Sequence, residues 1–325
     1  GDHRDLHSFP TRRSSDLYEG ADMDKKEYDA YIITTASDME RVKLLQDRMI
    51  KYLPSRKVYF VGSSEVGELI EKEKEDGFIS EESAERIDYI NEEDILSLDA
   101  VCKVMEDNMQ EILKGEPIAR RAAGWYYQQF IKYLLAERCS DEYYLVWDGD
   151  TIPCKEFTMF SDNGMPYLDT KHEYHKTYFD DLQRLIPGIQ KFVEQSFISE
   201  HMLFRTDIVK ELVKTIEANE EIKGVTFWEK IINSLTALEL NENSFSEYES
   251  YGTYVAYTDM FAYRMREWHS FRYGSTFFYV DKITERDFEW LGHDFFAISF
   301  EKMQQPREDT IGIFDNPKYQ KKFSA

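Results

Sequence analysis

A strand–helix–strand pattern near the start of the chain constrains the fold most. Residues 31–35 (YIITT) are a short β-branched run that indicates a buried strand, and residues 57–62 (KVYFVG) indicate a second one. Between them, residues 39–52 have the pattern of a helix, which Pro54 ends. Two strands joined by one helix form a βαβ unit with parallel strands. We therefore expect an α/β fold with a mainly parallel sheet that is flanked by helices.

Residues 1–17 (GDHRDLHSFPTRRSSDL) are interpreted as an artefact and are set apart from the fold. Codon by codon, they match one reading frame of a sequencing-library adapter. The alternative is an Arg- and Ser-rich targeting peptide. We expect this segment to be disordered and the natural chain to begin at or before Tyr18.

The composition disfavours several kinds of partner. A net charge of −23 argues against nucleic acid, whose phosphates attract basic surfaces, and against docking on an anionic membrane by charge alone. No apolar run approaches the roughly 20 residues that a membrane-spanning helix needs. The scattered Cys102, Cys139 and Cys154 indicate a reducing compartment without a disulfide framework. A cytoplasmic protein is expected, and a peripheral contact at the inner membrane face is the alternative.

Further elements follow the βαβ unit along the chain. The strands expected are residues 88–90, 143–147, 276–280 and 295–300. The helices expected are residues 96–113, 119–138, 177–186, 206–219 and 226–238, and another begins within 246–257. We divide the chain loosely into one domain, residues 18–275, and a C-terminal extension, residues 276–325, that packs on it.

Paired carboxylates directly follow the expected strand 143–147. Asp148 and Asp150 are separated by one glycine, and residues i and i+2 of an extended chain point the same way, so both can reach one cation. Mg²⁺ and Mn²⁺ take oxygen ligands and readily share themselves with a diphosphate. Open α/β sheets also bind ligands at the carboxyl ends of their strands. The alternative is an ordinary Asx-type turn after a strand.

The expected helix 119–138 contains polar side chains within an aromatic, apolar stretch. Trp125 and Gln129 are four residues apart and share one face of the helix. Buried amides need hydrogen-bond partners, so Gln128 and Gln129 either bind the hydroxyl groups of a ligand or fix a loop.

Three further candidates compete with structural roles. His201 lies beside an apolar strand, where a histidine is more often structural than catalytic. Residues 245–252 (FSEYESYG) hold acids and tyrosines that suit a carbohydrate, because hydroxyls donate to carboxylates and sugar faces stack on rings. On a helix, Glu247 and Glu249 point to different faces, so at most one is expected in a site. His293 is a candidate third metal ligand from the C-terminal part of the chain.

Taken together, these residues resemble nucleotide-sugar glycosyltransferases of the GT-A fold. More narrowly, they resemble an uncharacterised bacterial group with a GWY-QQ helix and a DxD strand end. The matching segments are GWYYQQFIK, YYLVWDGDTIP, SFISEHMLF and FSEYESYGTYV, whose order and spacing cover residues 28–272. The resemblance implies a single domain built round a Rossmann-like sheet, and a part in cell-surface polysaccharide synthesis.

The resemblance also implies roles for particular residues. The first βα turn, Thr34, Thr35 and Ala36, would hold the nucleotide, and Asp148 and Asp150 would hold the metal and the diphosphate. The segments SEHMLF and FSEYES would line the sugar and acceptor side. The chain departs from the pattern in that its first strand lacks the Pro-Thr-Tyr-Asn type of turn of many such enzymes. No catalytic base matches either, so the stereochemical course stays open.

The resulting hypothesis is a metal-dependent transferase that moves a sugar from a nucleotide-diphosphate donor to a glycan or other acceptor. Mn²⁺ or Mg²⁺ is the expected cofactor, held directly by Asp150, while Asp148 acts through water or contacts the donor. If the enzyme inverts, an acid deprotonates the acceptor hydroxyl; Glu247 is the expected base and His201 the reserve. The donor side is expected to include Trp125, Gln128 and Gln129.

Two other classes of protein stay open. A metal-dependent phosphohydrolase would use the same two aspartates and would need further ligands for a second metal. Asp169, His172 and His175 are the nearby candidates for that role. A non-catalytic carbohydrate-binding protein would bind glycan without needing nucleotide or metal.

Overall fold

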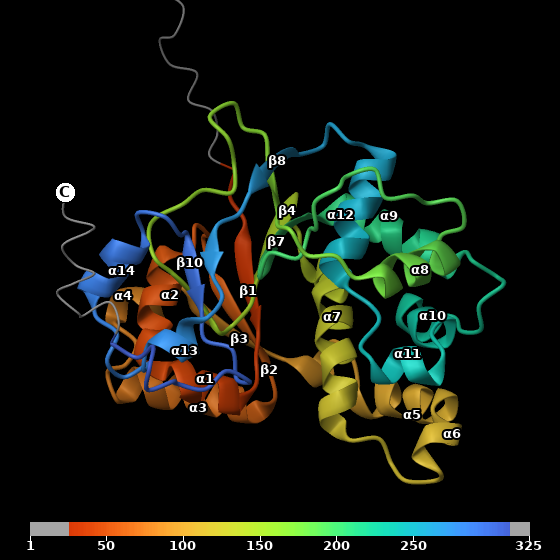
Figure 1. Ribbon diagram of the computed structural model, residues 1–325, viewed down its shortest axis with the longest axis horizontal. Coiled ribbons are helices and arrows are strands. Elements are labelled where there is room, and N and C mark those ends of the chain that lie inside the picture. Colours follow the sequence, from red (N-terminus) through yellow and green to blue (C-terminus); the bar gives the residue numbers. More distant parts are fainter. Residues whose placement is uncertain (1–25, 313–325) are drawn as a thin grey trace, which may run out of the picture.

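The computed structural model describes residues 26–312, and a five-stranded sheet forms its centre (Figure 1). The strands lie in the order β3-β2-β1-β4-β7. They are β1 (Asp29–Ile33), β2 (Val58–Gly62), β3 (Ile87–Asn91), β4 (Tyr143–Trp147) and β7 (His201–Arg205). The first four are parallel, and β7 pairs antiparallel with β4. The prediction of an α/β fold with a mainly parallel sheet is confirmed.

Both faces of this sheet are buried. Along β4, Tyr144 and Val146 belong to one hydrophobic core, whereas Tyr143, Leu145 and Trp147 belong to the other. Successive side chains of a strand point to opposite faces, so a strand covered on both sides needs apolar residues at every position. This explains why the sequence YYLVW is continuously apolar and does not alternate.

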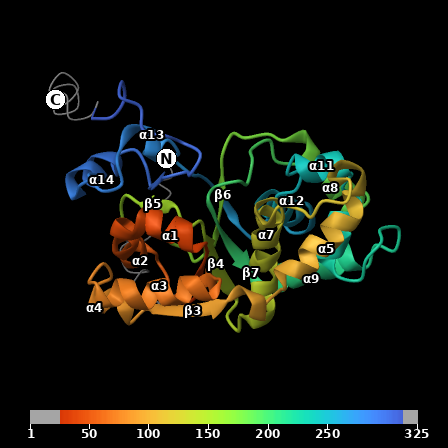
Figure 2. The same cartoon turned by 90° about the horizontal axis from the view of Figure 1, so that it is seen from below.

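Two groups of helices cover the two faces (Figures 1 and 2). The first group comprises α1 (Ala36–Val42), α2 (Gln46–Tyr52), α3 (Ser64–Glu75) and α4 (Glu81–Ala84). The second group comprises α5 (Leu98–Asn108), α6 (Gln110–Leu113), α7 (Arg120–Arg138), α8 (Lys176–Leu185), α9 (Thr206–Glu217), α10 (Phe227–Ser234), α11 (Ala237–Asn241) and α12 (Glu247–Thr258).

Short strands and two small helices complete the described part of the chain. β5 (Thr151–Pro153), β9 (Ser270–Phe271) and β10 (Ala297–Ser299) form a sheet with β10 in the middle. β6 (Tyr167–Thr170) pairs in parallel with β8 (Arg264–Glu267). The helices are α13 (Gly274–Phe277) and α14 (Glu285–Leu291).

Four expected elements differ from the structure. The helix expected at 39–52 is divided into α1, a 3-10 helix (Lys43–Leu45) and α2, and the one expected at 96–113 is divided into α5 and α6. A strand at 276–280 is wrong, because residues 274–277 form α13, and β10 already has β5 and β9 on its two sides. A single helix at 226–238 is also wrong. Thr226 and Thr236 each begin a helix with a capping box, and these local hydrogen bonds divide the segment into α10 and α11.

Two predictions concern the ends of the chain. The segment 1–17 and the last part of the expected C-terminal extension lie outside the described residues. The division of the chain at residue 275 stays a prediction, although β10, beyond that point, pairs with β5 and β9. Within residues 26–312, no helix is both long and apolar enough to cross a membrane.

Candidate active site

A cavity of about 590 Å³ opens at the carboxyl ends of β1 and β4. β1 has β2 on one side and β4 on the other, so the strand order reverses between β1 and β4. Open α/β sheets bind ligands at such a switch point, because the segments that follow the two strands diverge and leave a crevice. Thr34, which follows β1, and residues 148–150, which follow β4, line the cavity here.

Most of the predicted site residues line this cavity although they are far apart in the chain. They are Thr34, Trp125, Gln128, Gln129, Asp148, Asp150 and Glu247. Thr35 and Ala36 are not among the lining residues. Thr35 instead caps α1, where its hydroxyl accepts a hydrogen bond from the Asp38 amide at 3.2 Å, and Ala36 is the first residue of that helix.

The two predicted histidines lie away from the cavity lining. The buried ring of His201 lies between Trp147 and Trp268, with centroid distances of 5.0 and 4.3 Å. Its Nε2 is 2.7 Å from a carboxylate oxygen of Asp169, and its Nδ1 is 2.8 Å from the Ser199 carbonyl oxygen. His293 is exposed in the turn that follows α14.

The Asp-Gly-Asp segment is a tight turn packed against β1. The Thr151 amide donates to the Asp148 carbonyl at 3.0 Å, which closes the turn. A Cβ atom at Gly149 would lie 3.1 Å from Ile32 Cγ2 and 3.2 Å from Thr34 Oγ1. Glycine is therefore the residue that lets the two carboxylates approach the end of β1 so closely.

Lys132 is a functional candidate that the sequence analysis missed. Its side chain is only 5% exposed, and its Nζ lies 3.1 Å from Asp148 Oδ1 and 2.5 Å from Glu247 Oε1. The third ammonium proton is donated to Tyr248 Oη at 3.0 Å. Burial opposes the charge of Lys132, but the two carboxylates raise its pKa well above the usual value. One buried cation therefore joins a predicted metal ligand to the predicted base.

Glu247 begins α12, and Gln129 holds it there. The Glu247 amide donates to Gln129 Oε1 at 3.0 Å, and Gln129 Nε2 donates to the Trp125 carbonyl at 3.1 Å. Burial raises the pKa of the Glu247 carboxyl, and the ammonium of Lys132 opposes that rise. Glu249 points elsewhere, since its carboxylate accepts hydrogen bonds from Ser196 and Lys191 and does not line the cavity.

Asp150 carries more negative charge than its surroundings balance. Burial and the neighbouring Asp148 raise the pKa of Asp150 to about 6, and Arg41 offsets this only partly from 3.7 Å. A hard divalent cation fits this donor set, because it takes oxygen ligands and relieves the repulsion between two carboxylates. No cluster of three or more such metal-binding side chains occurs among residues 26–312.

Three further cations lie along the cavity wall. Arg41 donates to the Phe300 carbonyl and to Asp38 Oδ1 at 3.2 Å, Lys302 lies 3.3 Å from Ser37 Oγ, and Arg272 is paired with glutamates. Guanidinium and ammonium groups at a cavity wall are suited to bind phosphate oxygens.

The sequence offered a usable signal for Lys132, which is four residues after Gln128 on one face of α7. It offered none for Arg272 or Lys302, whose positions depend on long-range packing.

The chain is therefore an α/β protein with a cavity at the switch point of its sheet. The chain belongs to a family of unknown function, DUF6492, whose sequence profile matches residues 31–282. No curated protein matches the chain.

Several solved glycosyltransferases are similar to the chain. The galactosyltransferase LgtC, in complex with donor and acceptor sugar analogs, has a TM-score of 0.40 at 10% identity, covering 91% of this chain and 95% of LgtC. The bifunctional WbbM has a TM-score of 0.42 at 10% identity, covering 92% of this chain and 52% of WbbM. GlyE of Streptococcus pneumoniae TIGR4 has a TM-score of 0.30 at 14% identity, covering 68% of this chain and 45% of GlyE. At such scores the function of this chain has to be inferred from its own cavity.

Proposed function

We propose that this protein is a metal-dependent glycosyltransferase that moves a sugar from a nucleotide-diphosphate donor to a hydroxyl of a glycan or other acceptor. The observation that carries the proposal is the pair Asp148 and Asp150, which line a cavity at the switch point of the sheet and repel each other. The residues around the pair then divide into a cation site, a donor side and a base.

Asp148 and Asp150 would hold Mn²⁺ or Mg²⁺. The bound cation would neutralise the negative charge that develops on the departing diphosphate. Both contacts that Lys132 and Tyr248 make to Asp148 use Oδ1. Arg41 approaches Asp150 only at 3.7 Å. Neither carboxylate is therefore saturated by its protein neighbours.

The donor side of the cavity would use Thr34, Trp125 and Gln128. Gln129 also lines the cavity, but its side-chain oxygen already accepts a hydrogen bond from the Glu247 amide at the start of α12. Fewer of its polar atoms are therefore left to bind a ligand. Arg41 and Lys302 would bind the diphosphate oxygens. Of the three residues 34–36 that were predicted to hold the nucleotide, only Thr34 lines the cavity, and we propose only Thr34 for this role.

Glu247 would deprotonate the acceptor hydroxyl if the transfer inverts the anomeric centre. Burial raises the pKa of its carboxyl, which strengthens it as a base, and Lys132 fixes the position of its carboxylate. We do not propose His201 as a reserve base, because its two ring nitrogens bond to the Ser199 carbonyl and to Asp169, and neither of these residues lines the cavity. His293 is likewise not proposed as a metal ligand, because it does not line the cavity.

The phosphohydrolase alternative loses support from the placement of its candidate ligands. Asp169 is bound by Arg266 and His201, and His172 does not line the cavity that contains the aspartate pair. His175 does line it. A two-metal site would need more than this one additional ligand.

A thermal-shift panel tests the proposed function. UDP, GDP, CDP and their sugars are each added with and without Mn²⁺, because a ligand of the native state raises its apparent stability by mass action. One nucleotide family should raise the melting temperature only when Mn²⁺ is present. Stabilisation by glycans alone would indicate a binding protein, and release of free phosphate from a nucleotide would indicate a hydrolase.

A further inference from the structure

Glu200 has an unusual backbone beside the candidate active site. Its φ angle is +61°, in the left-handed region that side chains other than Gly and Asn rarely adopt. Within residues 26–312, the other non-glycine residues with positive φ are Lys114 and Asn243, which follow the helices α6 and α11. A left-handed residue is common after a helix, but Glu200 instead precedes β7 and is buried. Its conformation therefore calls for a separate explanation.

The carbonyl of Glu200 holds the backbone of Asp148, the first aspartate of the proposed metal site. β4 and β7 pair up to Trp147 and His201, and the next residues continue the pairing, since the Asp148 amide donates to the Glu200 carbonyl at 2.9 Å. The chain arrives at β7 from Ile198 and Ser199. The left-handed turn at Glu200 lets the chain change direction while its carbonyl still faces Asp148.

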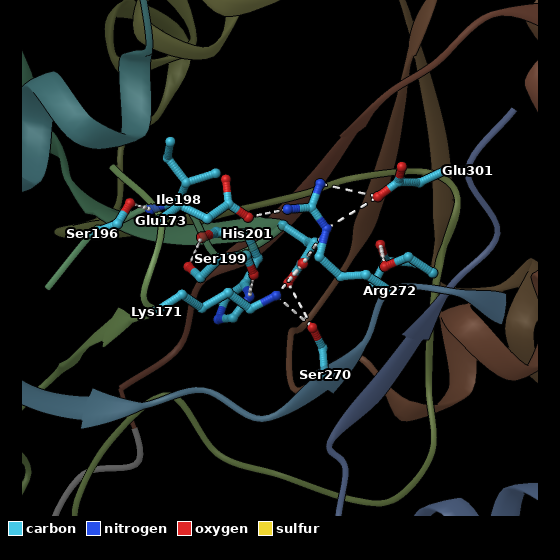
Figure 3. Close-up of polar contacts among 12 residues, drawn as sticks. Lys171, Glu173, Ser196, Ile198, Ser199, His201, Ser270, Arg272 and Glu301 are labelled. Atoms are coloured by element: carbon cyan, nitrogen blue, oxygen red, sulfur yellow. Dashed lines mark hydrogen bonds and ion pairs between the residues drawn. The ribbon is translucent and has the colours of Figure 1, made fainter. Parts of the chain in front are cut away.

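The side chain of Glu200 fixes a second part of the cavity wall. Its carboxylate accepts hydrogen bonds from Lys171 and from Ser270 Oγ, the latter at 3.1 Å, and Arg272 Nε lies 3.5 Å away. Figure 3 shows Arg272 between Glu173 and Glu301, with Lys171 and Ser270 beside it. Arg272 pairs with both of these glutamates, at 3.0 Å for Glu301. Arg272 and Glu173 line the cavity, so the carboxylate of Glu200 is anchored to its wall.

We propose that Glu200 is a positioning residue that sets the Asp148 turn through its backbone and Arg272 through its carboxylate. Glu200 itself does not line the cavity, and it acts through these two residues, which do. For Asp148, the consequence is a carboxylate held ready for the cation. For Arg272, it is a guanidinium held at the wall where an anionic donor would lie. This inference rests on the proposed function, although the geometry it describes exists without any ligand.

Three substitutions separate the two roles. Glu200→Ala removes the carboxylate whose contacts hold the left-handed backbone, and alanine adopts positive φ no more readily than glutamate, so both Asp148 and Arg272 should be released. Glu200→Gly removes the carboxylate but adopts positive φ freely, so Asp148 should stay in place while Arg272 is released. Glu200→Gln keeps the shape and an acceptor oxygen, so it should be the mildest variant. Lys114→Ala is the matched control, because Lys114 also has positive φ but does not line the cavity.

The experiment combines hydrogen exchange at the Asp148 amide with Mn²⁺ titration in the presence of a nucleoside diphosphate. In Glu200→Ala the amide should exchange at least tenfold faster and the Mn²⁺ dissociation constant should rise by about tenfold, as for other partners of metal ligands. Glu200→Gly should keep most of the amide protection. If Glu200→Ala lowers only the melting temperature and leaves both readouts at wild-type values, Glu200 is merely structural and the inference is wrong.

Hydrogen exchange distinguishes this inference from the proposed function, since it needs neither metal nor nucleotide. A wild-type protein that binds no Mn²⁺ would refute the transferase proposal. Even then, faster exchange of the Asp148 amide in Glu200→Ala would support the inference that Glu200 positions Asp148. Unchanged exchange would overturn that inference.

Discussion

Lys132 Nζ lies 3.1 Å from Asp148 Oδ1, although the two side chains come from different elements, α7 and the turn after β4. The same ammonium group binds Glu247 at 2.5 Å. The side chains of Lys132 and Glu247 are each only 5% exposed, so their contact is shielded from water, whereas the Asp148 side chain is 36% exposed at the cavity. The candidate metal ligand and the candidate base therefore share one cation, and removal of the Lys132 ammonium should affect both carboxylates.

Lys132→Met should destabilise the protein and shift its pH dependence. Removing one partner of a buried ion pair leaves an uncompensated charge, which costs about 3–5 kcal/mol of unfolding free energy. The loss of the ammonium should raise the pKa of Glu247 further, so the acidic limb of the pH–rate profile should move to higher pH. Chemical denaturation and a pH–rate profile measure the two effects.

The control for this variant is Lys230→Met. Lys230 is also a buried lysine, but it binds the backbone carbonyls of Asn219 and Ile222 and does not line the cavity. It should lose stability without any shift of the pH–rate profile. Equal profiles for Lys132→Met and wild type would contradict a link between Lys132 and the base.

Asp150→Asn should abolish metal-dependent turnover while the fold stays intact. The substitution keeps the size of the side chain but removes the charge that the cation needs. The metal-free variant should be at least as stable as wild type at pH 7, because burial and Asp148 disfavour the charged form of Asp150. Denaturation without metal and activity with Mn²⁺ test both statements; Asp162→Asn, in the surface turn 161–164, should change neither.

Mn²⁺ binding should strengthen as the pH rises through 6. The pKa of Asp150 is raised from its usual value of 3.8 to about 6, so at pH 5 a proton competes with the metal. The apparent dissociation constant should fall by about fivefold from pH 5 to pH 6 and by about tenfold from pH 5 to pH 7, and level off above that. In the metal-free protein, a rise in pH has an unfavourable effect, and the quantity affected is the free energy of unfolding. Because its folded state holds the proton more tightly than the unfolded state, the contribution of Asp150 to stability falls between pH 4 and pH 6. Calorimetric titrations at several pH values measure the first trend, and a flat affinity profile would exclude Asp150 as a ligand.

Glu247→Gln should separate catalysis from binding. Loss of a general base lowers turnover by about 10²–10⁴-fold, whereas Mn²⁺ and nucleotide should bind with little change. Steady-state kinetics and calorimetry on the same preparation show whether the two effects separate. Glu249→Gln is the control on the same helix, since its carboxylate binds Ser196 and Lys191. Near-normal turnover of Glu247→Gln would remove Glu247 as the base.

Gly149→Ala should weaken metal binding by moving the turn. The added Cβ would lie 3.1 Å from Ile32 Cγ2, so the turn must shift away from β1, at a cost of about 1–3 kcal/mol. Gly124→Ala is a contrasting control, because Gly124 lies inside α7 and its Cβ would meet nothing within 4 Å. That variant should gain about 0.5–1 kcal/mol from helix propensity. Denaturant unfolding and Mn²⁺ titration of both variants should show opposite changes in stability and a loss of affinity only at Gly149.

The fold could be predicted where local signals were strong. The run YYLVW marks the bounds of β4 correctly, because a strand buried on both faces needs apolar residues throughout. No comparable signal marks β8, whose residues Arg264–Glu267 alternate between polar and apolar only in part, and whose partner β6 lies far away in the chain. The run 276–280 has strand-forming residues, but strand formation also requires a free sheet edge, which sequence patterns do not report.

The residues of the candidate site could be predicted where a local sequence pattern marks them. Asp148 and Asp150 follow a recognisable strand, and Gln128 and Gln129 stand out in an apolar helix. His201 could not be placed, because the register between β4 and β7 decides which face it occupies: it pairs with Trp147 and packs with that residue away from the cavity. Lys132 was missed because its two carboxylate partners are 16 and 115 residues away in the chain.

The central claim is that one cation binds between Asp148 and Asp150 together with a diphosphate. Anomalous diffraction at the manganese edge, from crystals soaked with Mn²⁺ and a nucleoside diphosphate, tests it most directly. A single manganese peak within about 2.0–2.6 Å of an oxygen of either aspartate, and next to the diphosphate, is the predicted result. A peak elsewhere in the molecule, or a bound nucleotide without manganese beside these carboxylates, would contradict the account.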